Sequence, residues 1–502
     1  MSDTLAKVNS ELPGGFRDYL PQEMIVRNRM IANIRAVFES FGFDPLETPG
    51  MEYRRTLTGG NPDFRMITYD ARKSTARLSS DVDDPERTAL RFDLTVPLAR
   101  VVARYMGMEG ADRIRLPFKR YQIGNVWRGE KPQAGRFCEF MQFDADVVGT
   151  ATPVADAEII ALMVVTMRTL GVEHFRVRFN NRKLLNALSA YAGFDPALAP
   201  EVMRIIDKLP KIGRAAVLRE FVKPTRESAP QVTREEAIAT ASGGHTDVEG
   251  AENEEAAFGL GLPSDVADRI GAFLDLTGTT DELLNRCDDL FNGIAVAEDG
   301  IRELREIVAA LRAMGIDERS WAFDLSIARG LAYYTGPVFE TFITNPDGSS
   351  IEGFGGVFSG GRYDDLVSRF TDANVPATGA SIGVDRIFDQ LTRLGKITRV
   401  QTLTQVLVTV MDQSAMPEYL AMVSELRAAG IRTMLWVGEE SAFKAQLAYA
   451  TAQEIPIVII AGDRERAAGT VTVKDMRARR QAPFARPSLV DTVRHALGAS
   501  TV

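Results

Sequence analysis

Polar and charged side chains recur in a stretch that could bind a ligand carrying both positive and negative charge. Residues 119–130 (KRYQIGNVWRGE) and 140–146 (FMQFDAD) mix polar with apolar residues, which is typical of two paired strands. Residues 129–135 contain glycine, proline and charge, as a hairpin loop does. Since strand side chains alternate between two faces, Gln142 and Asp146 are predicted to point the same way. The alternative is a surface hairpin with solvated charges.

Three arginines stand in settings suited to phosphate. Arg128 lies in the hairpin, Arg329 opens the string RGLAYYTG, and Arg386 ends the string GASIGVDR. A guanidinium donates parallel hydrogen bonds and keeps its charge, although a single arginine is more often a surface ion-pair residue. Gly379 and Gly383 would let a flat ligand approach the backbone. No G-x-x-x-x-G-K-[ST] string occurs, so we expect nucleotide binding without a P-loop.

The elements that position these residues begin with a helix. Apolar residues recur at helical spacing over residues 23–41, and Gly42 is typical of a helix end. Residues 43–49 are predicted to be extended, because residues before proline disfavour the helix. Residues 91–95 are predicted to be a strand, with a helix after it, and to carry three polar residues on one face. These residues are Arg91, Asp93 and Thr95.

The remainder of the chain has two parts of different character. Residues 189–319 show helical patterns and an acidic run at 249–255, which indicates an inserted helical module. After a linker at 393–404, strands and helices alternate, which predicts an α/β domain with a mostly parallel sheet. Its first strand is not followed by a glycine fingerprint, so we expect no dinucleotide site there. Further expectations are strands at 322–328 and 333–343, a glycine-rich turn at 353–361, and a strand followed by a helix at 379–391.

The chain of 502 residues has a net charge of −9, yet it contains two clusters of basic residues. The length predicts about three domains, and the acidic balance argues against indiscriminate nucleic-acid binding. Two basic clusters suggest a large anionic partner contacted at two places, with solvated charge as the alternative. The first cluster is Arg113, Arg115, Lys119, Arg120, Arg128, Lys131 and Arg136, and the second is Lys474, Arg477, Arg479 and Arg480.

Cysteine and histidine usage indicates a protein of a reducing compartment without a metal centre. Cys138 and Cys287 are far apart, and His174, His245 and His495 are scattered, so neither a disulfide framework nor a metal site is expected. The sequence lacks an apolar run of about 18 residues and an apolar signal-peptide core. We therefore expect a cytoplasmic protein.

These segments together resemble class II aminoacyl-tRNA synthetases and, within them, the histidyl-tRNA synthetase family. Residues 43–52 are similar to class II motif 1, the hairpin with Arg128 and Glu130 to motif 2, and residues 379–386 to motif 3. Residues 329–334 and 359–364 resemble the family's two histidine signature peptides. Residues 13–18 resemble its opening peptide.

The resemblance implies an α+β multidomain protein. Its parts would be a class II antiparallel sheet flanked by helices, a helical insertion and a C-terminal α/β anticodon-binding domain. It also implies a homodimer that uses ATP with Mg²⁺, without a dedicated protein metal site, and that binds histidine and tRNA(His). The expected boundaries are 1–188 and 320–392 for the catalytic domain, 189–319 for the insertion, 393–404 for the linker and 405–502 for the anticodon-binding domain.

The implied reaction is activation of histidine by ATP, followed by transfer of histidine to the 3′ end of the tRNA. Arg128 and Arg329 would stabilise charge on the α-phosphate, Arg386 would hold the γ-phosphate, and Glu130 would lie near the adenine. The histidine site would comprise Asp93, Thr95 and Gln142 for the α-amino group, Asp146 and Tyr334 for the imidazole, and Tyr333 and Tyr363.

Two departures and two rival interpretations accompany this resemblance. Ala332 stands where the signature commonly has aspartate, and Cys138 where motif 2 commonly has a second arginine or another polar residue. One rival is the histidine-sensing regulatory subunit of ATP phosphoribosyltransferase, which usually lacks the C-terminal module and has eroded arginines. The other is an RNA-binding scaffold without aminoacylation. The retained arginines and C-terminal domain favour the ligase.

Overall fold

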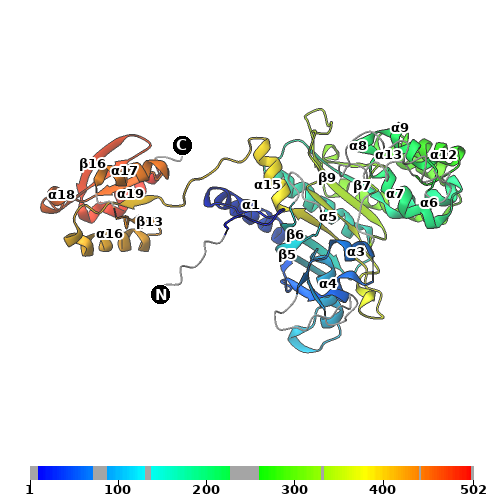
Figure 1. Cartoon of the computed structure of the whole chain (residues 1–502), viewed down its shortest axis with the longest axis horizontal. Coiled ribbons are helices and arrows are strands. Elements are labelled where there is room, and N and C mark those ends of the chain that lie inside the picture. The colour runs from blue at the N-terminus through cyan, green and yellow to red at the C-terminus, as the bar shows by residue number, and fades with distance from the viewer. Residues whose placement is uncertain are drawn as a thin grey trace, which may run out of the picture. The chain divides into compact units, whose positions relative to one another are not determined.

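The computed structural model describes residues 9–60, 62–71, 87–130, 137–225, 259–328, 333–439 and 442–498. Contacts within the chain define two compact units, one with residues 1–17 and 31–396 and the other with residues 18–30 and 397–502. Figure 1 shows the elements of each unit. Among the described residues, no helix is long and apolar enough to cross a membrane.

An eight-stranded sheet forms the centre of the first unit (Figure 1). Its outermost pairs, β1/β5 and β7/β8, are parallel, and every other pair is antiparallel. This confirms the antiparallel sheet. In spatial order the strands are β1 (Asp44–Pro45), β5 (Phe118–Trp127), β6 (Glu139–Val148), β11 (Ala377–Gly383), β10 (Phe358–Arg362), β9 (Pro337–Ile343), β7 (Phe175–Asn181) and β8 (Trp321–Phe323).

The predicted hairpin is formed by β5 and β6, which pair in continuous antiparallel register from Phe118↔Val148 to Trp127↔Glu139. Most of its predicted loop, residues 131–136, lies outside the described residues. The predicted strand-then-helix passage is also confirmed, because β11 leads directly into α15 (Val384–Arg393).

Helices cover the apolar face of this sheet. The helix α5 (Pro153–Thr169) contacts β6, β11, β10, β9 and β7, and α14 (Ala295–Ala313) packs on α5. Within α1 (Pro21–Ser40), which confirms the predicted first helix, Phe38 packs against Phe143 and Phe358 with ring centroids 4.8 and 6.3 Å apart. The opposite face is therefore free to carry polar residues.

The predicted strand at residues 91–95 is wrong. A small sheet, ordered β2 (Met51–Tyr53), β4 (Thr88–Leu90) and β3 (Asp70–Ala71), ends its middle strand at Leu90. The helix α4 (Thr95–Tyr105) begins at Thr95, because Asp93 Oδ1 accepts a hydrogen bond from the Val96 amide, as a helix-capping side chain does. The short helices α2 (Arg54–Thr58) and α3 (Pro62–Ile67) follow β2 in the chain.

The segment predicted to be a helical module is helical where it is described. Residues 226–258, which include the acidic run and His245, lie outside the described residues. Trp321 follows this segment on β8 and is buried, and its indole nitrogen donates to Ile316 O at 3.2 Å. The helices are α6 (Arg182–Ala192), α7 (Ala199–Ile206), α8 (Leu209–Ile212), α9 (Arg214–Val222), α12 (Ser264–Leu274), α13 (Thr280–Leu290) and α14.

Three strand boundaries differ from prediction, the first being that β9 begins at Pro337 and not at residue 333. β8 ends at Phe323, so residues 324–328 do not extend it. Gly360 and Gly361, predicted to lie in a turn, belong to β10. A Cβ at Gly360 would lie 2.1 Å from the Gly379 carbonyl oxygen, so here glycine allows two strands to approach closely rather than the chain to turn.

The second unit contains a five-stranded sheet in which parallel and antiparallel pairs are equally represented. β13, β12 and β14 are parallel, whereas β14, β15 and β16 are antiparallel, so the expectation of a mostly parallel sheet is wrong. The reason is a hairpin between β15 and β16, whose turn includes Arg479 with a positive φ of 52°. The strands are β13 (Thr433–Leu435), β12 (Val406–Val408), β14 (Ile457–Ile460), β15 (Thr470–Asp475) and β16 (Arg480–Ala485).

Helices bury the apolar core of this second sheet. Val406, Ile457, Tyr419 and Leu489 are among the core residues that the strands and helices share. On another cluster, the Trp436 and Tyr449 rings meet edge to face with centroids 5.3 Å apart. The helices are α16 (Met416–Ala428), α17 (Phe443–Ala452), α18 (Asp463–Ala467) and α19 (Leu489–Gly498).

Candidate active site

The polar face of the large sheet is built from aligned rows of residues on β5, β6, β11 and β10. In one row Arg120 lies opposite Asp146, which lies opposite Gly379 and then Gly361. The next row on the same face is Gln122, Asp144, Ser381 and Ser359, and a third contains Gly124, Gln142 and Gly383. Gln142 and Asp146 therefore share one face, as predicted.

Asp146 is buried at the centre of the first row. Its Oδ2 lies 2.8 Å from Arg120 Nη2, and its Oδ1 accepts a hydrogen bond from the Tyr363 hydroxyl. Burial raises the pKa of Asp146, while Arg120 and Tyr363 oppose that rise. A Cβ at Gly379 would lie 2.0 Å from Asp146 Oδ1, and one at Gly361 would lie 2.9 Å from the Tyr334 ring, so glycines leave the room that these groups occupy.

A second cluster forms around Asp93. Burial raises the pKa of Asp93 to about 6, against the effects of the Val96 amide and Arg128. Its Oδ2 lies 3.4 Å from the Tyr333 hydroxyl, which also bonds to Thr95. The Tyr333 ring lies 5.1 Å from that of Tyr334 and 5.9 Å from that of Tyr363, measured between centroids. The structure thus brings together most residues predicted to bind the amino acid.

Gln142 lies beside these clusters and is buried. Its Nε2 donates to Ser381 Oγ at 2.9 Å, and its Oε1 makes no hydrogen bond to the described residues. The same holds for Asp144 Oδ1 and for Nε and Nη1 of Arg120. Buried polar groups are normally paired. A concentration of unpaired polar atoms on one sheet face therefore indicates a site that can hydrogen-bond a polar ligand.

The predicted phosphate-binding residues lie at the ends of adjoining elements. Arg128 follows β5, donates from Nε to Phe92 O at 3.1 Å and stacks on the Phe140 ring. Arg386, in the first turn of α15, donates to Gly356 O at 2.8 Å. Asp385 joins α15 to β6 by accepting from the Met141 amide at 2.6 Å. Arg329 and Ala332 lie outside the described residues.

Glu130 and Cys138 face each other at the base of the hairpin loop. The Cys138 thiol is 3.5 Å from the Glu130 carbonyl oxygen, and Cys138 is buried and unbridged. Cys138 also accepts through its carbonyl from the Arg128 amide at 2.8 Å, so it continues the strand pairing beyond Trp127.

The Trp127 ring lies against Gly50, where an added Cβ would be 3.7 Å away.

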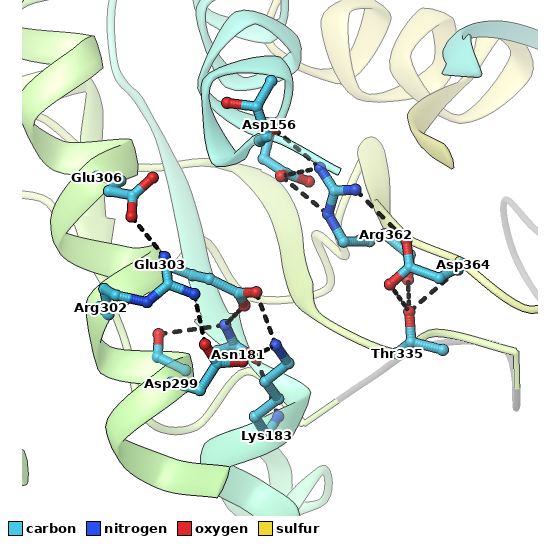
Figure 2. Close-up of polar contacts among 12 residues, drawn as sticks. Asp156, Asn181, Lys183, Asp299, Arg302, Glu303, Glu306, Thr335, Arg362 and Asp364 are labelled. Atoms are coloured by element: carbon cyan, nitrogen blue, oxygen red, sulfur yellow. Dashed lines mark hydrogen bonds and ion pairs between the residues drawn. The ribbon is translucent and has the colours of Figure 1, made fainter. Parts of the chain in front are cut away.

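Thr335, directly after Tyr334, and Asp364, directly after Tyr363, are joined by two hydrogen bonds (Figure 2). Thr335 Oγ1 donates to Asp364 Oδ2 at 2.9 Å and accepts from the Asp364 amide at 3.1 Å. On the other face of β10, Arg362 forms a buried ion pair with Asp156 of α5 at 2.5 Å (Figure 2). These contacts fix Tyr334 and Tyr363 relative to the sheet.

Several residues of this site were absent from the sequence prediction. No binding or catalytic role was assigned to Asp144, Ser381, Asp385 or Asp156, and Arg120 was assigned to a basic cluster contacting an anionic partner. That assignment is wrong for Arg120, which is fully buried. Its alternation with Gln122 along β5 was a usable signal, but its pairing with Asp146 depends on the strand register, which was unknown.

The second basic cluster lies on the β15–β16 hairpin of the C-terminal unit. Arg477, Arg479 and Arg480 are exposed there. Beside them is a surface hollow of about 680 Å³, whose lining includes Arg480, Phe484 and His495. The exposed arginines give the hairpin a positive surface beside this hollow, whose lining also includes Asp475 and Asp491.

A large, mostly antiparallel sheet flanked by helices, together with a separate C-terminal α/β domain, is the architecture of a class II aminoacyl-tRNA synthetase. Residues 15–387 match the family model described as histidyl-tRNA synthetase, and residues 405–495 match the anticodon binding domain. The chain belongs to the histidyl-tRNA synthetase family. It is accordingly a ligase that uses ATP to join histidine to tRNA.

Relatives and solved structures agree with this membership. The histidine–tRNA ligase of Jannaschia sp. (strain CCS1) is 38% identical, with 93% of this chain and 90% of that protein covered. That of Brucella abortus (strain S19) is 37% identical, with 95% and 90% covered. The structure of histidyl-tRNA synthetase from Nostoc sp. PCC 7120 has a TM-score of 0.75 at 29% identity, covering 97% of this chain and 100% of that one.

A Bacillus halodurans C structure described as an ATP phosphoribosyltransferase regulatory subunit/histidyl-tRNA synthetase shares the fold. Its TM-score is 0.65 at 20% identity, and the comparison covers 88% of this chain and 97% of that one.

Proposed function

We propose that the polar face of the large sheet activates histidine and then transfers it to tRNA(His). The substrate carboxylate would attack the α-phosphorus of ATP, forming histidyl-adenylate and releasing pyrophosphate. A terminal hydroxyl of the tRNA would then attack the acyl carbon, forming the ester and releasing AMP. The observation that carries the proposal is the cluster of buried Asp146 and Tyr363 with partly buried Tyr334, for which Gly379 and Gly361 leave room.

In this proposal the pocket recognises both ends of histidine. Asp146 accepts an imidazole N–H, and the Tyr334 hydroxyl bonds to the other ring nitrogen. Asp93, Thr95 and Gln142 receive the α-ammonium group, and Tyr333 and Tyr363 enclose the substrate. A substrate without the ring nitrogens would leave buried polar groups unpaired, so it would be rejected.

The arginines would bind the triphosphate in the arrangement that the family resemblance implies. Arg128 and Arg329 would neutralise charge on the α-phosphate as it becomes five-coordinate, and Arg386 would hold the γ-phosphate. Glu130 would lie near the adenine. Mg²⁺ is proposed to bind as its complex with ATP, coordinated chiefly by the phosphate oxygens.

The remaining assignments concern the whole chain. We assign residues 1–188 and 320–392 to the catalytic domain, 189–319 to an insertion, 393–404 to a linker and 405–502 to the domain that contacts the anticodon. The functional form is proposed to be a cytoplasmic homodimer, with residues 43–52 of motif 1 at the dimer contact.

ATP–pyrophosphate exchange with each of the twenty amino acids tests the activation step. We expect exchange with histidine alone. If histidine binds without supporting exchange, the chain acts instead as a histidine sensor of the ATP phosphoribosyltransferase regulatory type. Exchange with another amino acid at a comparable kcat/KM would contradict the assigned specificity pocket. Retention of Arg128, Arg386 and an anticodon-binding domain at residues 405–495 favours the ligase.

A further inference from the structure

Arg120 lies at the junction between the two halves of the proposed amino-acid pocket. Its side chain is 0% exposed, and its Nη2 lies 2.8 Å from Asp146 Oδ2. The same nitrogen donates to the Leu94 carbonyl oxygen at 3.1 Å. Leu94 separates Asp93 from Thr95 in the chain. One nitrogen atom therefore connects the carboxylate proposed for the imidazole with the segment proposed for the α-ammonium group.

Arg120 also balances charge within this part of the sheet. Asp144 and Asp146 are both 2% exposed and are two residues apart on β6. Arg120 favours the ionised form of each. Arg91, a buried arginine whose guanidinium lies against Gly124 of β5, instead donates to the carbonyl oxygens of Thr48 and Asn125 at 2.7 and 2.9 Å. Arg120 is thus the guanidinium that pairs with Asp146.

We infer that Arg120 is a positioning residue for histidine, which keeps Asp146 ionised and fixes its distance from the Asp93–Thr95 segment. The inference rests on the proposed function, because it assumes that Asp146 receives the imidazole. Its consequence is that recognition of both ends of the substrate depends on a side chain that touches neither end. The Leu94 bond and the Asp146 ion pair would fail together when the guanidinium is removed.

Arg120→Met tests the inference because methionine preserves much of the apolar stem without the charge. We expect the KM for histidine in ATP–pyrophosphate exchange to rise about 100-fold, since an unpaired buried carboxyl protonates or moves. The KM for ATP should change by less than about threefold, because the proposed ATP contacts do not include Arg120. Arg120→Lys should restore part of the loss, as it restores charge without the planar fork.

A pH profile separates positioning from simple loss of structure. The titratable groups facing Asp146 are Arg120 on β5, Asp144 on β6, and Tyr334 and Tyr363. Losing the cation raises the pKa of Asp146 further, so the carboxylate forms only at higher pH. The kcat/KM for histidine of Arg120→Met should therefore increase more steeply from pH 6 to 9 than that of the parent protein.

Arg178→Met is the matched control within the same sheet. Arg178 lies on β7, beyond β11, β10 and β9 from β6, and pairs with Asp324 at 3.3 Å. This variant should retain the parent's KM for histidine and its pH profile. A parent protein that does not exchange with histidine would refute the proposed function itself. An active parent, with a folded Arg120→Met variant whose KM and pH profile are unchanged, would overturn only the role of Arg120.

Discussion

Asp144 and Asp146 occupy the same strand face but differ in their partners. Asp146 has an ion pair with Arg120 and a hydrogen bond from Tyr363, whereas Asp144 bonds to Ser381 and its Oδ1 has no hydrogen bond among the described residues. Burial raises the pKa of Asp144 to about 7, and the nearby Asp146 adds to the rise while Arg120 opposes it. Such a carboxyl is largely protonated in slightly acidic solution.

Asp144→Asn should stabilise the protein more at pH 8 than at pH 5. The pKa of an unfolded aspartate is about 3.9, below the folded value of about 7. The folded state therefore binds the proton more tightly, and the free energy of unfolding falls as pH rises through this window. Asparagine removes that penalty. The Tm difference between variant and parent, measured at both pH values, checks the sign, and an equal difference at pH 5 and 8 would contradict it.

Arg329 carries the mechanistic proposal most directly, although it lies outside the described residues. Arg329→Ala should lower kcat for ATP–pyrophosphate exchange about 100-fold to 1,000-fold, because a charge stabilising the transition state is lost. The dissociation constant of histidine should change little, and direct binding measurements supply that control. Unchanged adenylate formation would remove Arg329 from the reaction.

At the scale of elements, the glycines of β10 and β11 form the floor of the pocket. A methyl group at residue 379 would meet Asp146 Oδ1 at 2.0 Å and Ala145 O at 2.7 Å. Gly379→Ala should therefore displace Asp146 and raise the KM for histidine roughly 10-fold or more. The comparison is Gly107→Ala, where nothing lies within 4 Å of an added Cβ, and histidine kinetics should stay normal. Equal kinetics in both variants would mean that the floor tolerates a methyl group.

Sequence patterns predicted the hairpin and most helices because their signals are local. The β5–β6 pairing follows from alternating residues on each side of one loop. Residues 91–95 were assigned wrongly because alternation over five residues was weighed without the capping role of Asp93. Gly360 and Gly361 were assigned to a turn because close packing against β11 is a long-range contact. The burial of Arg120 was missed for the same reason, since only the register places Asp146 opposite it.

At the scale of the whole molecule, the division of the chain after residue 396 could be anticipated because residues 393–404 interrupt periodic segments on both sides, whereas the grouping of residues 18–30 with the second unit could not. The antiparallel pairing of two strand pairs in the second unit's sheet could not be anticipated in this way. Parallel connections need long crossovers, and the short connection from β15 to β16 forms a hairpin instead. Whether two strands pair parallel or antiparallel therefore depends on the length of the connection between them as well as on their residue types.

Arg480→Ala should weaken tRNA binding and leave amino-acid activation intact. Arg480 is exposed on β16, at the hollow that Phe484 and His495 also line. If Arg480 contacts a phosphate, the slope of log K for tRNA against log salt should fall in magnitude by about 1. Arg464→Ala on α18, also exposed, is the control and should keep the parent slope. A loss of ATP–pyrophosphate exchange in Arg480→Ala would contradict the separation of roles.

The chain has three tryptophans, and each lies in a different part of the protein. Trp127 ends β5 next to Arg128, buried Trp321 lies on β8 after the helical segment, and Trp436 meets Tyr449 in the C-terminal unit. Intrinsic fluorescence of variants that keep one tryptophan and replace the other two with phenylalanine would follow nucleotide binding, unfolding beside the helical segment, and tRNA docking separately. Three single-tryptophan variants of this chain would thus report on these regions one at a time without an attached dye.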